Sequence, residues 1–493
     1  MITKQSPIHV PHTYRPRKPS WPARLLVIIC LLAMVFAPLP YPAVGLKRAV
    51  AFSVGDEKLV GEKLLSIVRR NFKLIEEPDI LQYITGLGNE VLTVTDAQYF
   101  KYNFFVINQK EFNAFAAPSG LIFAYSGLIE TMDTEGELLS VLAHETAHVT
   151  NRHIARQAEK SKTANIASMV LVLAGIAMGG GDLSQAMIVG GMAAGTSMQL
   201  RYSRQDEEEA DRMAYDWLVA MHRDPSEMIA MLRKMYRVNA ISMNQTPPYL
   251  LTHPEPSQRI GYVQDLRRMS KPGPFPARAP FQFKRMKYRL LSITRDPAAL
   301  LEHLLPASEA NQSNAKDDQD GMRFYGISQA YLENAQFDQA RAALQRVIND
   351  YPDQPILLTD LGRTYYEEGR YDTALEYFNQ ARDKLPGDAF TAYYLARTLQ
   401  QQGKPTEALK LYNEILLTVP NLTRLHYQIG EIKSQQGDPA AGHYHLGLYH
   451  WFEGDAETAR FHLNQTIKLA GEQADIKLQA NEMLTKITEL EKI

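Results

Sequence analysis

Apolar residues follow different patterns along this chain, and each pattern predicts a different kind of structure. Between residues 46 and 290, stretches with helical spacing mix with stretches that alternate as strands do, which predicts a domain of helices with a few strands. The segment PASEANQSNAKDDQDG at residues 306–321 is polar and contains few apolar positions. Such a composition is typical of a linker, and we place the linker at residues 291–320.

From residue 321 to the C-terminus the pattern repeats with a step of 34 residues. The recurring positions are alanines, prolines and glycines: Ala340, Ala374 and Ala408; Pro352, Pro386 and Pro420; Gly369, Gly403 and Gly437. This period, with small residues at helix crossings and a helix-ending proline, resembles the tetratricopeptide repeat. We therefore expect residues 321–493 to form an α-solenoid, with one helix at about 439–453 shared by two units and a polar cap at about 475–491. Such a solenoid presents a concave surface to a partner polypeptide, and a simple spacer is the alternative.

The N-terminal 45 residues predict export. Basic residues precede the apolar run LLVIICLLAMVFA at residues 25–37, which is too short to span a bilayer comfortably. Small residues follow it, so we expect a signal peptide at residues 1–45, with an uncleaved N-terminal anchor as the alternative. Cys30, the only cysteine, lies inside this run, and the mature chain would therefore have no thiolate for catalysis.

Length and charge narrow the classes further. A chain of 493 residues exceeds what one core normally organises, so two or three domains are expected. The formal net charge is -2, and phosphate binding needs a concentrated basic surface. We therefore expect no nucleic acid among the partners.

The chemistry of the first domain centres on LSVLAHETAHVTNRH, residues 139–153. On a helix, His144 and His148 lie one turn apart and can direct a ring nitrogen at the same ion, while Glu145 sits beside that face. A carboxylate in that place can take the proton of a metal-activated water and return it to the leaving amine. The motif therefore predicts a zinc peptidase with Glu145 as the general base, and the apolar side of the helix favours this over a chance arrangement.

Two segments of the sequence contain candidates for the third metal ligand. His153 lies nine residues from His144, about 180° round a continuous helix, so we expect it to face away. In RYSRQDEEEADRMAYDWL, residues 201–218, Glu207 and Asp211 lie one turn apart, so the first can bind the metal while the second orients a ligand histidine. Glu208 and Glu209 are more typical of a solvated helix face.

HETAH followed by YSRQDEEEAD about sixty residues later resembles the metallopeptidase family of HtpX, the Ste-type CAAX proteases and mitochondrial Oma, where HExxH precedes ExxxD. The resemblance implies a mainly α fold, with a gluzincin-type metalloprotease domain of helices and a small β-sheet at residues 46–290. It implies one Zn²⁺ per chain, with Glu207 as the third ligand and Asp211 as the family's aspartate. It also implies that the strand in NAFAAPSGLIFAYSGLI, residues 113–129, is an edge that pairs with an extended substrate.

His253 in LLTHPEPSQRI belongs to the same resemblance, because a His-Pro pair follows the zinc helices in that family. As a neutral imidazole it can fill the fourth position at the metal and hold the peptidase closed, or it can donate to the oxyanion of the tetrahedral intermediate. A histidine that only fixes a proline-rich turn is the remaining alternative.

An exported domain of this type followed by tetratricopeptide repeats is similar to the periplasmic BepA-like proteases of Gram-negative bacteria. That resemblance implies a periplasmic protease that acts on unfolded or misassembled protein substrates in outer-membrane protein assembly, and that contacts the assembly machinery through its repeats. A chaperone or assembly adaptor with a normally latent peptidase is the alternative function.

Residues 163–198 complicate this picture, because they are apolar and rich in glycine. The runs within them are shorter than about 20 residues and interrupted by glycines and an aspartate, so we do not expect them to span a bilayer. A hairpin in contact with the membrane surface and a buried helical pair are the two alternatives.

Overall fold

The computed structural model describes residues 52–96, 98–160, 166–178, 202–241, 247–271, 273–310 and 318–493. Every element described below belongs to one compact unit, Ala51–Ile493. The predicted signal peptide or anchor at residues 1–45 lies outside the described residues. In the part of the chain that is described, no helix combines the length and the apolar character that a membrane crossing needs.

A three-stranded sheet lies at the centre of the first part of the chain. Its strands are β1 (Asn103–Ile107), β2 (Ala114–Ala117) and β3 (Leu121–Tyr125), in the order β1-β3-β2. β1 runs parallel to β3 and β2 runs antiparallel to it, so β2 lies at one edge. The turn between β2 and β3, η1 (Pro118–Gly120), requires its glycine: Gly120 has a φ of +79°, and a Cβ there would lie 2.7 Å from the carbonyl oxygen of Lys101.

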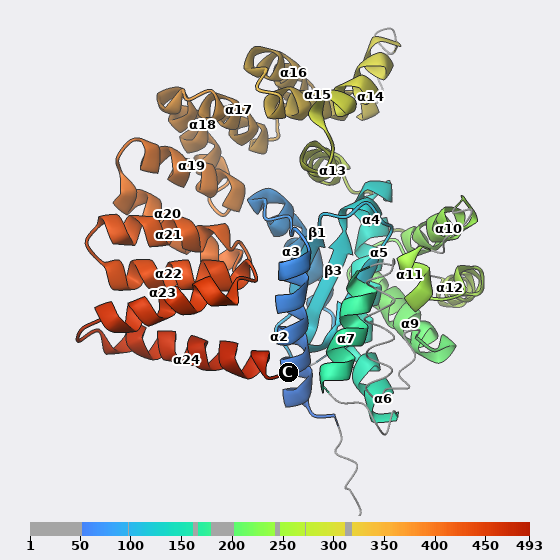
Figure 1. The fold of residues 1–493 in the computed structure, drawn as a ribbon. Helices are drawn as coiled ribbons and strands as arrows, with labels where there is room; N and C mark the ends of the chain where they lie inside the picture. Colours follow the sequence, from blue (N-terminus) through green and yellow to red (C-terminus); the bar gives the residue numbers. More distant parts are fainter. Residues whose placement is uncertain are drawn as a thin grey trace, which may run out of the picture. The chain divides into compact units, whose positions relative to one another are not determined.

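Helices cover both faces of this sheet, which is why its strands are apolar throughout rather than alternating. One face packs against α3 (Pro78–Leu92) and α5 (Glu135–Thr150), and the other against α2 (Val54–Asn71) and α7 (Ile166–Ala177) (Figure 1). The remaining helices of this part are α4 (Ser126–Thr131), α6 (His153–Lys160), α9 (Arg204–Ala220), α10 (Ser226–Ile241), α11 (Pro248–Thr252) and α12 (Pro256–Ser270). Of these, α9 and α10 pack directly on α5.

Helix α7 is the described part of the apolar segment 163–198. Met169, Val172 and Ala177 are fully buried, and the helix packs against α2. This part of the segment therefore agrees with the buried alternative. The membrane-surface alternative depends on residues 179–198, which lie outside the described residues.

Helices α13 (Phe281–Thr294) and α14 (Pro297–Ala310) connect the first part of the chain to the repeats. The predicted linker at 291–320 is wrong over its first half, because α14 buries Leu300, Leu301 and Leu304 against Ile327 of the first repeat helix. The polar composition that suggested a linker starts only at residue 306, after the apolar face of α14. Residues 311–317 lie outside the described residues.

The repeats form the predicted solenoid of antiparallel helix pairs. Its helices are α15 (Asp318–Glu333), α16 (Phe337–Asp350), α17 (Ile356–Glu367), α18 (Tyr371–Lys384), α19 (Ala389–Gln401), α20 (Pro405–Thr418), α21 (Arg424–Gln435), α22 (Pro439–Phe452), α23 (Ala456–Leu469) and α24 (Ala474–Glu491). The recurrent alanines Ala340, Ala374 and Ala408 are fully buried, and the recurrent glycines follow the first helix of each pair with φ between +74° and +84°. Helix α22 packs on both α21 and α23, as its shared role predicts. The predicted architecture, a mainly helical domain with a small sheet followed by a solenoid, is confirmed.

A buried network of charges joins α13 to both parts of the chain. Arg285 donates two hydrogen bonds of 2.9 Å to Asp360 of α17 and one of 3.2 Å to Asp79 of α3. Arg289, one turn further along α13, donates to Asp79 at 3.1 Å and to Glu77 at 3.0 Å. The repeats are therefore held to the sheet-containing part by paired buried charges as well as by apolar packing.

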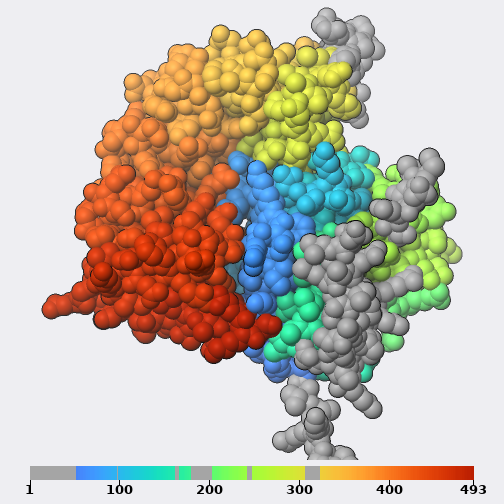
Figure 2. Space-filling model, in the orientation of Figure 1, coloured from blue at the N-terminus to red at the C-terminus, as the bar shows by residue number. Residues whose placement is uncertain are grey.

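The last helix also contacts the first described one. Lys63 Nζ of α2 donates to the carbonyl oxygen of Leu490 at 2.6 Å, and Lys486 of α24 pairs with Glu62 at 2.9 Å. The space-filling view shows α2, in blue, against the red C-terminal repeats (Figure 2). The predicted cap at the end of the solenoid therefore packs on the sheet-containing part instead of facing only solvent.

Candidate metal centre

Helix α5 carries the HETAH motif, and its start is well determined by local sequence. The hydroxyl of Thr134 accepts a hydrogen bond from the backbone N–H of Glu137, which caps the helix. The helix then runs between the sheet and α9, so both faces are buried. His144 and His148 lie one turn apart on it, with their Nε2 atoms 3.0 Å from each other.

Helix α9 brings the acidic segment to these histidines. Ser203 and Asp206 form a capping box at its start, which places Glu207 in the first turn. The Glu207 carboxylate lies 3.4 Å from His148 Nε2 and 3.6 Å from His144 Nε2. Within the same helix, Glu208 is exposed, as a residue of a solvated face should be.

His253, which ends α11, completes a cluster of four side chains. Its Nδ1 lies 2.9 Å from Glu207 Oε1 and 3.3 Å from His144 Nε2. One ligand atom from each of His144, His148, Glu207 and His253 lies within 4.8 Å of all the others, and all four residues are buried. Residues from three separate helices thus converge on one point.

Asp211 lies one turn after Glu207 and contacts the outer nitrogen of a cluster histidine. Its Oδ1 is 2.9 Å from His144 Nδ1, which leaves the Nε2 of that ring directed at the cluster. Arg259 of α12 donates two hydrogen bonds to Asp211, at 2.8 and 2.7 Å, and pairs with Glu207 at 2.6 Å. Sequence reasoning assigned Arg259 no contact at this site.

Glu145 points into the same buried space beside the cluster. Its Oε1 accepts a hydrogen bond of 3.0 Å from the hydroxyl of Tyr249 and lies 3.5 Å from His253 Nε2. Its Oε2 is buried and has no hydrogen-bond partner among the described residues. Sequence reasoning missed Tyr249, whose ring also stacks on His253 at 4.3 Å; its only signal was its position one turn before His253.

His153 contributes no atom to the four-residue cluster, as expected, but it does not face away from His148. Helix α5 ends at Thr150, and Arg152 adopts a φ of +50°, so the chain turns before α6 begins at His153. His153 Nδ1 therefore lies 2.7 Å from His148 Nδ1, on the side of that ring away from the cluster. The projection along a continuous helix failed because the helix does not continue.

Burial and neighbouring charges give His148 and Glu207 the protonation states that a metal site needs. Burial lowers the pKa of His148 well below its ordinary value, so the ring is neutral and offers a lone pair. Burial alone would raise the pKa of Glu207, but Arg259 and His253 hold it well below its usual range, and the carboxylate stays ionised. A neutral imidazole at His148 and an ionised carboxylate at Glu207 belong to a donor set that suits a catalytic zinc.

Comparisons with known proteins agree with this geometry. Residues 81–267 match peptidase family M48, and residues 325–389 and 365–429 match tetratricopeptide repeats. The beta-barrel assembly-enhancing proteases of Escherichia coli and Yersinia pestis are 29% and 28% identical to this chain over 313 and 319 residues. Each match covers 63% of this chain and 63% of the relative. The mitochondrial metalloendopeptidase OMA1 of Schizosaccharomyces pombe is 27% identical over 184 residues, 37% of this chain and 52% of its own length.

The fold, the buried cluster and these matches define the class: the chain is a metalloprotease. It carries a peptidase family M48 domain followed by tetratricopeptide repeats, the combination that the sequence motifs predicted. The family implies a bound metal ion, and tetratricopeptide repeats indicate interaction with other proteins.

Proposed function

We propose that the chain is a zinc endopeptidase in which His144, His148 and Glu207 bind one Zn²⁺. The observation that carries this proposal is the convergence of their ligand atoms beside the unpaired Oε2 of Glu145. Three protein ligands with a neighbouring carboxylate are the usual arrangement of a zinc peptidase. Zinc, when bound, supplies a Lewis acid that polarises a carbonyl and makes water a stronger nucleophile near neutral pH.

Residues of the chain itself transfer the proton, orient a metal ligand and bind the substrate. Glu145 takes a proton from the attacking water and returns it to the leaving amine, because its carboxylate lies in the buried space next to the ligand atoms. Asp211 holds His144 in the orientation that presents Nε2, and Arg259 fixes Asp211 in turn. β2, at the edge of the sheet, pairs with an extended substrate, since Ala116 and Ala117 line a small cavity together with His148.

His253 has a role at the metal in this proposal. Its Nδ1 stands within 3.3 Å of two of the ligand residues, which suits a fourth ligand that keeps the peptidase closed. The donor role, in which His253 stabilises the oxyanion, would use Nε2, which is buried and has no hydrogen-bond partner among the described residues.

The biological setting comes from the relatives. Two of them are named beta-barrel assembly-enhancing proteases, which supports a role for this chain in outer-membrane protein assembly and quality control in the periplasm. Unfolded or misassembled proteins are then its substrates, and the repeats bind the assembly machinery. Residues 1–45 act as the export signal, residues 46–290 form the peptidase domain and residues 321–493 the repeat domain.

The test is Glu145→Gln in the full chain, with Glu208→Gln as the matched control on the exposed face of α9. We expect Glu145→Gln to keep one equivalent of zinc and to lose cleavage of an unfolded protein such as casein by about two to four orders of magnitude. Glu208→Gln should behave as the unmodified chain does. Normal cleavage by Glu145→Gln would overturn the proposal.

A second candidate function is an assembly adaptor whose peptidase is normally latent. The position of His253 inside the cluster favours it, because a filled fourth position leaves no room for substrate at the metal. In a strain that depends on this protein, Glu145→Gln would then preserve envelope function, while removal of the repeats would abolish it. Loss of envelope function in Glu145→Gln would rule the adaptor role out.

A further inference from the structure

The two ligand histidines of α5 differ in what their Nδ1 atoms contact on the side away from the cluster. Asp211 directly accepts the Nδ1–H of His144. Among the described residues, the Nδ1 of His148 forms its hydrogen bond with the Nδ1 of His153, at 2.7 Å, and not with a carboxylate. His153 is fully buried, and nothing in the proposed peptidase chemistry uses it.

The hydrogen-bond directions along this contact are fixed by the chemistry of imidazole. His148 presents Nε2 to the cluster, so a metal there needs the Nε2 lone pair and leaves the hydrogen on Nδ1. Two imidazole nitrogens 2.7 Å apart share one hydrogen, and His153 Nδ1 must therefore accept. The hydrogen of His153 then resides on Nε2, which lies 3.3 Å from Glu209 Oε2, an acceptor.

The turn before α6 is built to hold His153 in this place. Arg152 keeps its positive φ because its guanidinium donates to Glu57 at 2.6 Å and to the carbonyl oxygen of Phe52 at 3.0 Å. Asn151 Nδ2 lies 2.8 Å from the sulfur of Met213 on α9, which ties the turn to the helix of the acidic motif.

A second metal site at His153, Asp206 and Glu209 is the competing interpretation of the same residues. Arg156 argues against it, because its guanidinium already pairs with Glu209 at 2.7 Å and approaches Asp206 at 3.8 Å. A fixed cation beside both carboxylates makes a second cation unfavourable there. Glu209 is instead an acceptor held in place by Arg156.

We propose that His153 is a positioning residue of the metal centre: it accepts the Nδ1–H of His148, fixes the tautomer that offers Nε2 to the metal, and passes its own Nε2–H to Glu209. This inference rests on the proposed zinc site. It goes beyond that site because it assigns the HETAHVTNRH stretch a further functional histidine that binds no metal itself. It also explains why the helix breaks between the two motif histidines and His153.

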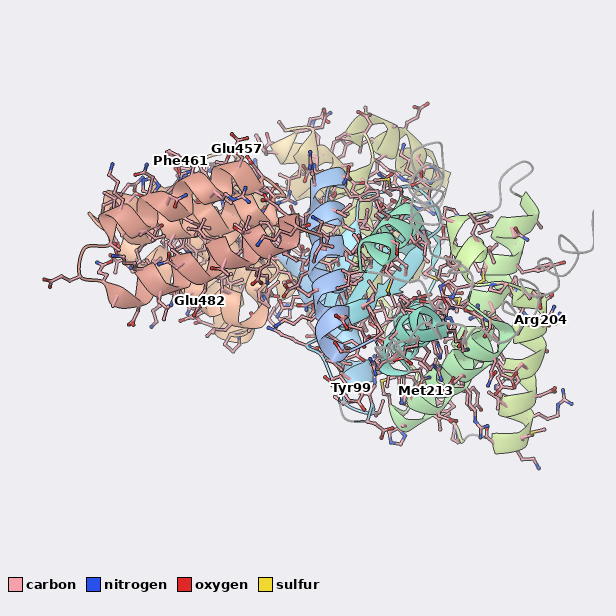
Figure 3. All side chains as sticks on the ribbon, turned by 60° about the horizontal axis from the view of Figure 1, so that its bottom comes forward. Tyr99, Arg204, Met213, Glu457, Phe461 and Glu482 are labelled. Carbon is pink, nitrogen blue, oxygen red and sulfur yellow. The ribbon has the colours of Figure 1, made fainter. Side chains whose placement is uncertain are left out.

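The test compares His153→Asn, His153→Gln and His153→Phe in the full chain. Asparagine places its carbonyl oxygen where Nδ1 of histidine stands, glutamine reaches instead towards the Nε2 position, and phenylalanine keeps the ring without an acceptor. Zinc affinity is measured by competition with a chromophoric chelator, and circular dichroism of the metal-free proteins checks the fold. Arg204→Ala, at the exposed first position of α9, is the control (Figure 3).

We expect zinc affinity to fall about 10- to 100-fold in the glutamine and phenylalanine variants, and to fall by less than about tenfold in the asparagine variant. Unchanged affinity in the folded glutamine variant, or an equal loss in asparagine and glutamine, would overturn the inference. Failure of the zinc site itself is separate, because the unmodified chain and Arg204→Ala would then bind no zinc at all.

Discussion

Replacing Asp79 by alanine should destabilise the protein by about 3 kcal/mol, because it leaves buried arginines with fewer partners. Removing one member of a buried ion pair costs about 3–5 kcal/mol, since the remaining charge stays desolvated. Asp79 is buried, and burial alone would raise its pKa, but Arg289 and Arg285 hold it below the ordinary value. We expect a destabilisation at the lower end of this range, because Arg285 still pairs with Asp360 and Arg289 still pairs with Glu77 after the substitution.

Urea denaturation followed by circular dichroism measures the effect, and Asp338→Ala is the matched control. Asp338 is 93% exposed and pairs with Arg341, so its loss should cost less than about 1 kcal/mol. Combining Asp79→Leu with Arg289→Met should recover part of the loss, because two opposite charges leave the interior together. If Asp79→Ala and Asp338→Ala unfold at the same urea concentration, the buried network does not stabilise the junction between peptidase and repeats.

Three further predictions concern the metal, the fourth ligand and acid stability. Glu207→Ala should lose the bound zinc while Glu208→Ala keeps one equivalent by elemental analysis; the reverse result would show that the ligand register in the EEE run is shifted. His253→Ala should cleave casein faster than the unmodified chain if the residue is a latch, whereas cleavage slowed about a hundredfold with zinc retained would make it an oxyanion donor. Burial lowers the pKa of His426 to about 3 and that of His445 to about 4, so below pH 6.5 the unfolded chain takes up protons that the folded chain does not. The stability that is complete at pH 7 should therefore fall by about 2 kcal/mol per histidine at pH 5. Replacing both residues by glutamine should remove this part of the pH dependence in urea titrations, and an unchanged pH dependence after the replacement would contradict it.

Most of the fold could be predicted from local pattern. The step of 34 located buried alanines and the glycines that follow the first helices, because both are set by the geometry of one helix pair repeated along the chain. Helix α14 was missed because a polar composition starting at residue 306 outweighed the leucines before it. Burial of those leucines depends on Ile327, a partner that local pattern does not reveal.

The site was predictable where its residues share a helix. His144 with His148, and Glu207 with Asp211, are pairs at a spacing of four, and the structure gives each pair the common face that this spacing predicts. Tyr249 reaches Glu145 across 104 residues, and no spacing rule anticipates such a contact. His153 was misplaced for the opposite reason, since the spacing rule was applied across a turn where Arg152 leaves the helical conformation.

The contact between α2 and α24 has a consequence for how the chain is made. Lys63 and Leu490 are separated by 427 residues, so the face of α2 that receives α24 is complete only after Leu490 has been added. At a synthesis rate of about 5–20 residues per second, that face of α2 remains uncovered for roughly 20–85 s. For most of this time Gly454 has not yet been added either. It packs so closely on α2 that a Cβ in its place would lie 2.9 Å from the backbone of Arg70. The first helix of the described residues is thus covered late, and a nascent chain that stalls within the repeats exposes it.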